Sequence, residues 1–171
     1  MVYESEFPLF DLDDLTVFDL TGDGSNRIEV LTGIGELGIG DYEFALDGGA
    51  YQNSPVFEDV PPGIHQVSVR DKNGCGTKSV AASVIGYPLY FTPNGNGQDD
   101  NWQVLGVNGV FQSQSLIYIF DRHGRLLAQI KTDGPGWDGT YNGTPMPADD
   151  YWFRVGLEDG RTFTGHFSLI R

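Results

Sequence analysis

Turn-forming residues divide this chain into short segments and leave no room for long helices. The 171 residues include 24 glycines and nine prolines. No segment longer than a few residues shows the i, i+3, i+4, i+7 apolar pattern of an amphipathic helix. Short alternating or apolar runs recur instead about every eight to twelve residues, as in β-sandwiches. The sequence therefore predicts an all-β protein made of two consecutive small antiparallel β-sandwich domains, both immunoglobulin-like.

The runs that predict strands are bounded by Gly, Pro, Asn or Asp. The run Leu116 to Phe120 is so uniformly apolar that we expect it to be buried on both faces. Hairpin turns are expected at Asn73-Gly74, at Asp121 to Gly124 and at Glu158 to Gly160. The predicted strands are 27–31, 42–46, 56–60, 64–70, 77–84, 116–120, 125–130, 151–157 and 161–170.

The domain boundary is expected near Ile85 to Pro88, because Pro88 biases the residue before it toward an extended link. The predicted domains are residues 1–86 and 87–171. The first holds fifteen Asp and Glu against four Lys and Arg, which gives −11, and the second holds nine against six, which gives −3. An acidic surface of this kind repels phosphate backbones, so we expect no nucleic-acid partner.

The ends of the chain bear on where the protein works. No apolar run approaches the roughly 18 to 20 residues that cross a bilayer, so no transmembrane segment is expected. Met1 to Glu4 is acidic, where an export signal has a basic segment and an apolar core. We therefore expect a C-terminal piece of a longer secreted protein, with cargo domains upstream. Cys75 has no partner within the chain, and is expected either to pack at a hairpin end or to pair with an upstream cysteine.

Five sequence blocks in the second half of the chain stand in a distinctive order that ends at the C-terminus. They are Phe91 to Trp102 (FTPNGNGQDDNW), Ile119 to Arg125 (IFDRHGR), Gly136 to Gly143 (GWDGTYNG), Tyr151 to Phe153 (YWF) and Gly165 to Arg171 (GHFSLIR). Together they closely resemble the gliding-motility-associated C-terminal domain, which is the type B sorting signal of the bacterial type IX secretion system. The segment from Gly40 to Gly76 resembles the immunoglobulin-like module that commonly precedes this domain in adhesin-type surface proteins.

The resemblance implies that residues 87–171 are a non-enzymatic export signal. Such a signal is recognised by the type IX translocon once the chain has reached the periplasm. The protein is then held at the cell surface by outer-membrane partner proteins or released. Recognition is expected through edge-strand pairing or through a shaped face. The residues expected on the recognised surface are Asp121, Arg122, Gly124, Arg161, Gly165, His166 and Arg171.

The loop Asn94 to Asn101 carries oxygen-bearing side chains at alternate positions, like the first half of a calcium loop. In the family that the chain resembles, an acidic residue stands where this chain has Asn96. Two interpretations stay open: an Asx-rich turn satisfied by its own backbone amides, or a calcium site formed by Asn94, Asn96 and Asp100. The segment Thr21 to Asn26 raises the same question more faintly.

The aromatic residues leave a second function open. Trp102, Trp137, Tyr141, Tyr151 and Trp152 are expected to fill a small sandwich core and cap its ends, but a sugar-stacking platform is the alternative. The rival to the sorting function is accordingly a carbohydrate- or cell-surface-binding module, with Tyr42, Tyr51 and Phe57 of the first domain as its aromatics. No enzyme is expected, because the sequence contains neither metal-ligand His or Cys spacing nor a nucleophile elbow.

Overall fold

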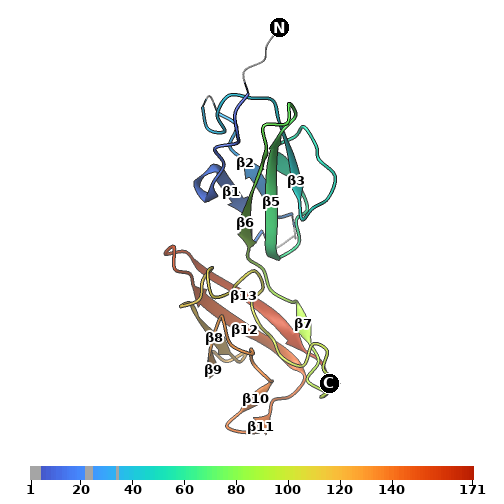
Figure 1. Ribbon diagram of the computed structural model, residues 1–171. Helices are drawn as coiled ribbons and strands as arrows, with labels where there is room; N and C mark the ends of the chain where they lie inside the picture. The colour runs from blue at the N-terminus through green and yellow to red at the C-terminus, as the bar shows by residue number, and fades with distance from the viewer. Residues whose placement is uncertain (1–4, 22–24, 34) are drawn as a thin grey trace. The chain divides into compact units, whose positions relative to one another are not determined.

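The computed structural model describes residues 5–21, 25–33 and 35–171 (Figure 1). The chain divides into two compact units, Met1–Val84 and Ile85–Arg171. The boundary lies two residues before the expected one. The described residues form strands, loops and one short 3-10 turn, η1 (Leu12–Asp14), so the all-β prediction is confirmed. No helix among them is long and apolar enough to span a bilayer.

The first unit contains two three-stranded antiparallel sheets. One has the strand order β1-β2-β4 and the other the order β3-β5-β6. The strands are β1 (Leu15–Phe18), β2 (Arg27–Val30), β3 (Tyr42–Leu46), β4 (Val56–Phe57), β5 (Gly63–Asp71) and β6 (Thr77–Val84).

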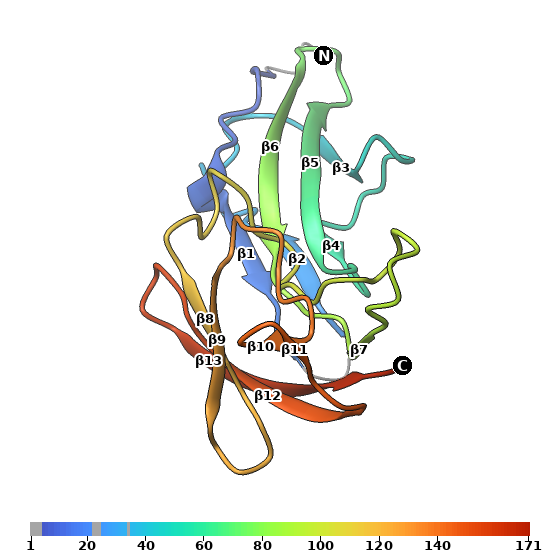
Figure 2. The ribbon, with the colours of Figure 1, turned by 90° about the horizontal axis from the view of Figure 1, so that it is seen from below.

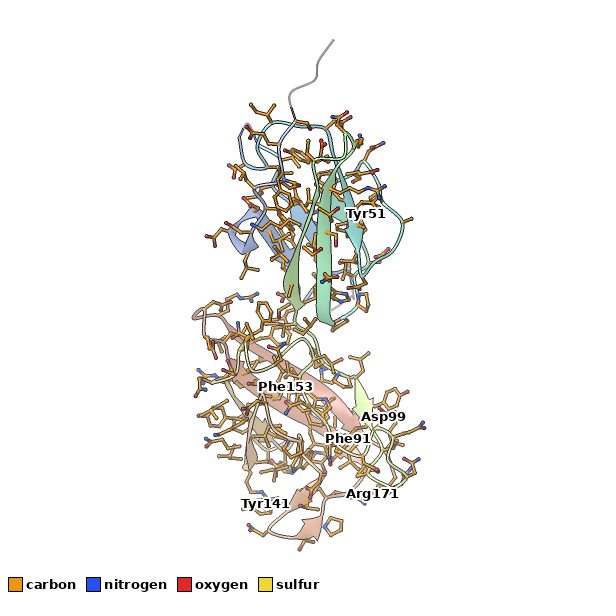
Figure 3. The ribbon with its side chains drawn as sticks, viewed as in Figure 1. Tyr51, Phe91, Asp99, Tyr141, Phe153 and Arg171 are labelled. Atoms are coloured by element: carbon orange, nitrogen blue, oxygen red, sulfur yellow. The ribbon has the colours of Figure 1, made fainter. Side chains whose placement is uncertain are left out.

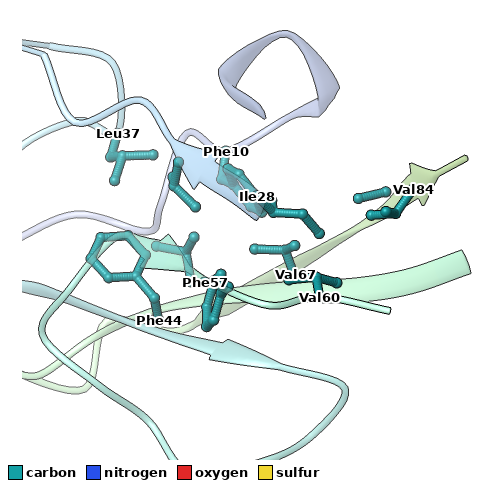
Figure 4. Close-up of a cluster of buried hydrophobic side chains, with 11 residues drawn as sticks. Phe10, Ile28, Leu37, Phe44, Phe57, Val60, Val67 and Val84 are labelled. Atoms are coloured by element: carbon teal, nitrogen blue, oxygen red, sulfur yellow. The ribbon is translucent and has the colours of Figure 1, made fainter. Parts of the chain in front are cut away.

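Apolar side chains from both sheets form the core of the first unit (Figure 4). Alternation along β5 turns Val67 and Val69 inward, where both are fully buried. Burial of one face of each sheet against the other makes the unit sandwich-like. The buried cluster is Phe10, Ile28, Val30, Leu37, Phe44, Phe57, Val60, Val67, Val69, Ala82 and Val84.

The second unit is built on one five-stranded sheet with the order β7-β13-β12-β8-β9 (Figures 1 and 2). Neighbouring strands in this sheet are antiparallel, except that β7 runs parallel to β13. This pair departs from the prediction of an all-antiparallel sandwich. A two-stranded ribbon, β10-β11, accompanies the sheet. The strands are β7 (Tyr90–Phe91), β8 (Leu116–Phe120), β9 (Leu126–Lys131), β10 (Thr140–Tyr141), β11 (Thr144–Pro145), β12 (Asp149–Gly156) and β13 (Thr162–Leu169).

Aromatic rings fill the core of the second unit, against one face of this sheet. Trp102 is fully buried and stacks on Phe167, with ring centroids 4.0 Å apart and an interplanar angle of 13°. Trp137 meets Tyr151 edge-on at 5.1 Å. Reciprocal backbone hydrogen bonds of 2.9 Å join Trp102 to Trp137, so an irregular segment outside the main sheet is fixed to the core.

The face of the sheet opposite this core is only partly covered. Along β8, Ile117 and Ile119 are fully buried, whereas Leu116, Tyr118 and Phe120 are partly exposed. The prediction that this strand is buried on both faces is therefore wrong. The strand is uniformly apolar because it lies inside the sheet between β12 and β9, not because a second layer covers its outer face.

Other local predictions had mixed outcomes. The turns of the β5–β6, β8–β9 and β12–β13 hairpins each contain a glycine with positive φ whose N–H donates to the carbonyl three residues earlier. The four strands that pattern reasoning missed are β1, β7, β10 and β11, of which three have only two residues. Cys75 is exposed rather than packed, with its Sγ 3.1 Å from the carbonyl oxygen of Ser5.

Candidate functional site

The loop after β7 is organised around one carboxylate. Asp100 Oδ1 accepts the backbone N–H groups of Asn94 at 2.9 Å and Gly95 at 2.6 Å, and Asp100 Oδ2 accepts that of Gly97 at 2.7 Å. The hydrogen bond from the Gly97 N–H is the largest cause that holds the pKa of the Asp100 carboxyl below its ordinary value, and the bond from Gly95 is the next largest. Asn96 Oδ1 in turn accepts the N–H of Gln98 at 2.8 Å.

The three residues named in the calcium hypothesis all accept hydrogen bonds from the backbone of their own loop. Asn94 Oδ1 also accepts a backbone N–H, that of Asn96, at 3.0 Å. Every candidate side chain is thus engaged by the loop's own amides, and Asp100 is the one carboxylate among the three. In the described part of the chain, no three His, Cys, Asp or Glu side chains are grouped to hold a metal. The contacts support an Asx-rich turn, while the second segment, Thr21 to Asn26, includes residues 22–24, which lie outside the described ranges.

The Asp100 carboxylate makes a testable contribution to this loop. Because its folded pKa is below the unfolded value of about 3.9, its contribution is complete above that pH and is lost as the pH falls through the folded pKa. Asp100→Asn is expected to accelerate hydrogen exchange at the Gly95 and Gly97 amides at neutral pH, while Asp99→Asn leaves those rates near wild type.

Millimolar Ca²⁺ is expected to leave the midpoint of thermal unfolding unchanged, because the oxygen-bearing side chains of this loop already accept backbone hydrogen bonds. A rise of several degrees on adding Ca²⁺ would contradict the turn interpretation.

A second carboxylate stabilises the β8–β9 turn. Asp121 Oδ1 accepts the backbone N–H groups of His123 and Arg125, both at 2.9 Å, and Asp121 Oδ2 lies 3.1 Å from Arg125 Nε. The Arg125 backbone hydrogen bond is the main cause that holds the pKa of Asp121 below its ordinary value. Gly124 completes the turn with a φ of +80°. The turn is therefore preorganised, and the Arg122 side chain remains largely exposed.

Three segments distant in the sequence meet at one end of the second unit, where Figure 3 labels Arg171. Arg122 Nη1 lies 3.4 Å from Asp149 Oδ2, and Arg171 Nε donates to the carbonyl oxygen of Met146 at 3.0 Å. Burial, and then the charge of Asp149, raises the pKa of Tyr151, while Arg171 acts in the opposite direction. A hollow of about 230 Å³ opens there, lined by residues 121–123, 125, 146, 147 and 149–151. We call residues 121–125 and 146–151 together with Arg171 the terminal cluster.

Arg161 lies away from this cluster. It is in the β12–β13 turn, where its Nε is 2.8 Å from Asp159 Oδ2. The hairpin pairs Gly156 with Thr162 at that end and Asp149 with Leu169 at the other. Seven residue steps along a strand amount to about 24 Å. The seven residues expected on one surface therefore do not all come together.

Gly165 and His166 differ in what they contact. A Cβ on Gly165 would lie 2.7 Å from a ring carbon of Phe153, so this glycine makes room for core packing. His166 is exposed on the opposite face of the sheet, and its ring is 6.3 Å from that of Trp152. Trp152 is 42% exposed, so the prediction that all five aromatic residues fill the core or cap its ends is wrong for this one, and Tyr141 is only partly buried. Along a strand, neighbours of the buried Tyr151 and Phe153 must face outward.

In the first unit, neighbouring groups engage His65 and two of the aromatic residues named for the carbohydrate-binding alternative. His65 is buried, with one ring nitrogen 2.7 Å from Asp47 Oδ2 and the other 2.7 Å from the Pro61 carbonyl oxygen, so no nitrogen is left to activate a nucleophile. Phe57 belongs to the core, and the guanidinium of Arg70 covers the Tyr51 ring at 3.7 Å. Two of the three aromatic residues named for the carbohydrate-binding alternative are therefore engaged within the unit.

Sequence reasoning missed two residues that matter at these surfaces, Asp149 and Arg154. The contact of Asp149 with Arg122 depends on strand pairing between β8 and β12, which no local sequence pattern indicates. Trp152 and Arg154 share the outer face of β12. The two-residue period of the strand predicted over 151–157 places Arg154 on the same face as Trp152, and was the signal that could have identified it.

Solved structures give only weak likenesses. They include dimeric latent PorU from Porphyromonas gingivalis (16% identity, 94% of this chain and 18% of that one, TM-score 0.36). The BSP domain of a biofilm-associated protein is similar at the same level, with 13% identity over 93% of this chain and 30% of that one, and a TM-score of 0.33. So is Tp47, the 47-kilodalton lipoprotein of Treponema pallidum, with 10% identity over 98% of this chain and 52% of that one, and a TM-score of 0.33. This chain thus spans between 18% and 52% of their lengths, and TM-scores this low support no conclusion about it. Curated proteins gave no sequence match.

A family model gives a specific match. The model of the CHU_C type IX secretion signal domain matches residues 85–169, which are nearly the whole second unit. The matched range contains the Asp100 loop, the Asp121 turn and the β12–β13 hairpin. The C-terminal half of this chain therefore belongs to the family of type IX secretion signal domains.

Proposed function

We propose that residues 85–171 are an export signal read by the type IX translocon, and that residues 1–84 are an immunoglobulin-like spacer between this signal and upstream cargo domains. The family match at residues 85–169 is the observation that carries the proposal. The chain then reaches the cell surface or the medium through the periplasm. Outer-membrane partner proteins retain it or release it.

The terminal cluster is the surface we assign to recognition. The Asp121 carboxylate holds the turn in one conformation, so little conformational entropy is lost when a partner docks there. Arg122 is 63% exposed and Arg125 is 58% exposed, so both guanidinium groups remain accessible. The side chain of Arg171 is anchored beside them through the Met146 carbonyl. A fixed charge pattern of this kind favours specific docking.

At the last residues of the C-terminal strand, where β7 pairs with Ser168 and Leu169, capture by a shaped face is better supported than strand addition. In the sheet, β13 lies between β7 and β12. The backbone N–H of Ile170 donates to the Phe91 carbonyl at 3.0 Å, and that of Ser168 donates to the Leu89 carbonyl at 2.9 Å. Because these residues already have neighbours on both sides, a partner strand would have to displace β7 to pair there.

A secretion assay tests the sorting role. Residues 85–171 and residues 1–171 are each fused behind a periplasm-targeted fluorescent reporter, in cells with and without a working type IX translocon. Reporter is expected outside the cell only when the translocon works, for both fusions. If the reporter stays in the periplasm in both strains, the sorting proposal is wrong. Export of only the longer fusion would make the first unit part of the signal.

The recognition surface is tested within the same assay. Replacing Arg122 and Arg171 together by Gln is expected to lower export about tenfold, which corresponds to a loss of roughly 1.4 kcal/mol of binding. Arg161→Gln removes a charge at the other end of the hairpin and should leave export near wild type. Thermal unfolding of the purified variants checks that both are folded. Equal export by all three proteins would exclude the terminal cluster while leaving the sorting function intact.

A further inference from the structure

The outer face of the five-stranded sheet carries an aromatic row in which Trp152 and His166 are exposed and Phe120 is partly buried. The register of β8, β12 and β13 places Phe120, Trp152 and His166 opposite one another on adjacent strands. The other two tryptophans, Trp102 and Trp137, are buried and donate their indole N–H to backbone carbonyls. The Trp152 indole makes no such hydrogen bond with the described residues, so both its ring face and its donor remain accessible.

A hollow lies over this row. Its volume is about 440 Å³, within the range of small-molecule sites. The Trp152 and His166 rings are inclined by 32° and provide flat walls. The hollow is lined by Phe120, Trp152, Phe153, Arg154, Thr164, Gly165 and His166.

The charge of the hollow is opposite to that of the protein. The chain carries a net charge of −14, yet no carboxylate lines this site. The side chain of Arg154 is exposed and forms no ion pair or hydrogen bond with the residues that the structure describes. Each of the other arginines pairs with a carboxylate or with a backbone carbonyl: Arg27, Arg70, Arg122, Arg125, Arg161 and Arg171. Arg154 is therefore available to an anionic ligand.

We propose that this face binds an acidic saccharide, in addition to the sorting role of the unit. The apolar face of one sugar ring stacks on the Trp152 indole. The carboxylate of a uronic acid pairs with the planar Arg154 guanidinium, whose geometry suits bidentate contact. Thr164 and His166 supply hydrogen-bonding groups at the rim for sugar hydroxyls.

The size of the apolar surface favours a saccharide over a protein partner. A stable protein interface buries roughly 800 Å² on each side around an apolar centre. Here the centre is essentially one exposed indole, 42% accessible, with polar side chains at its border. One aromatic ring bordered by hydrogen-bonding groups matches the dimensions of a pyranose.

Titration of the full chain with tetragalacturonic acid tests this proposal. Calorimetry gives the affinity, and the indole N–H resonance of Trp152 reports the site. The methyl ester of the same tetrasaccharide is the uncharged control. Binding of the acid is expected to weaken with added salt and to exceed binding of the ester about tenfold, the effect of one charge-assisted hydrogen bond pair.

Variants separate the two contacts. Arg154→Gln is expected to lower the affinity for the acid about tenfold and leave the affinity for the ester unchanged. Trp152→Ala is expected to lower both affinities. Arg161→Gln removes the same charge outside the hollow and should change neither. Trp152→Phe keeps a stacking surface and is expected to retain binding if Trp152→Ala proves unstable. Failure of the acid to bind would overturn the proposal, as would equal binding of acid and ester, or binding only of an acidic peptide such as tetraglutamate.

Discussion

Trp102→Ala is expected to unfold the C-terminal unit, at a cost of about 3–5 kcal/mol. Trp102 is fully buried, stacks on Phe167 and also contacts Phe153, with ring centroids 4.8 Å apart. Its indole N–H donates to the Pro88 carbonyl at 2.9 Å, so the substitution also leaves that acceptor unpaired. A loss of this size is comparable to the whole stability of a small domain.

Urea unfolding followed by amide resonances of residues 85–171 measures this effect, with resonances of the first unit as an internal reference. Trp152→Ala is the matched control, because Trp152 is 42% exposed on the other face of the sheet. It is expected to cost less than half as much, since less apolar area leaves water on folding at that position. Similar losses in the two variants would show that Trp102 is not central to the core.

Gly136→Ala is expected to destabilise the same unit by about 3 kcal/mol or more. Gly136 has a φ of +92°, and a Cβ there would lie 2.5 Å from the Trp102 carbonyl oxygen. That oxygen accepts the N–H of Trp137 at 2.9 Å, so it cannot retreat without losing the bridge between the two tryptophan segments. Both the backbone conformation and the steric contact therefore oppose a side chain.

Gly143→Ala separates these two causes. Gly143 also has a positive φ, +77°, but a Cβ there meets nothing within 4 Å. Its cost is expected to be about 1–2 kcal/mol, the penalty of the left-handed conformation alone. Thermal or urea unfolding of both variants gives the difference. If Gly136→Ala costs no more than Gly143→Ala, the close approach to Trp102 does not constrain the turn.

The sorting assignment and the calcium interpretation show what motifs can and cannot provide. Five motif blocks in order were sufficient to identify the family that the match at residues 85–169 shows. The same motifs did not show that Asp100 is surrounded by the loop's own amides. Oxygen-bearing residues at alternate positions are compatible with either arrangement, and backbone geometry decides between them.

The sequence by itself determined the all-β class, the hairpin turns and most of the longer strands. These depend on local chemistry: alternation sets which side chains share a face, and glycine permits the positive φ of a turn such as that at Gly124. The two-residue strands β7, β10 and β11 were missed because a run that short has no measurable period. Local signals therefore located the three hairpins but not β7, β10 and β11.

Only the tertiary structure decided which distant residues meet. The pairing of β8 with β12 brings Arg122 to Asp149, and the length of the β12–β13 hairpin separates Arg161 from them. The tertiary structure also leaves the outer face of the sheet uncovered, so that Trp152 and Arg154 are exposed. Sheet order and coverage arise from long-range pairing and packing, whose free energy depends on contacts between segments that no local pattern encodes.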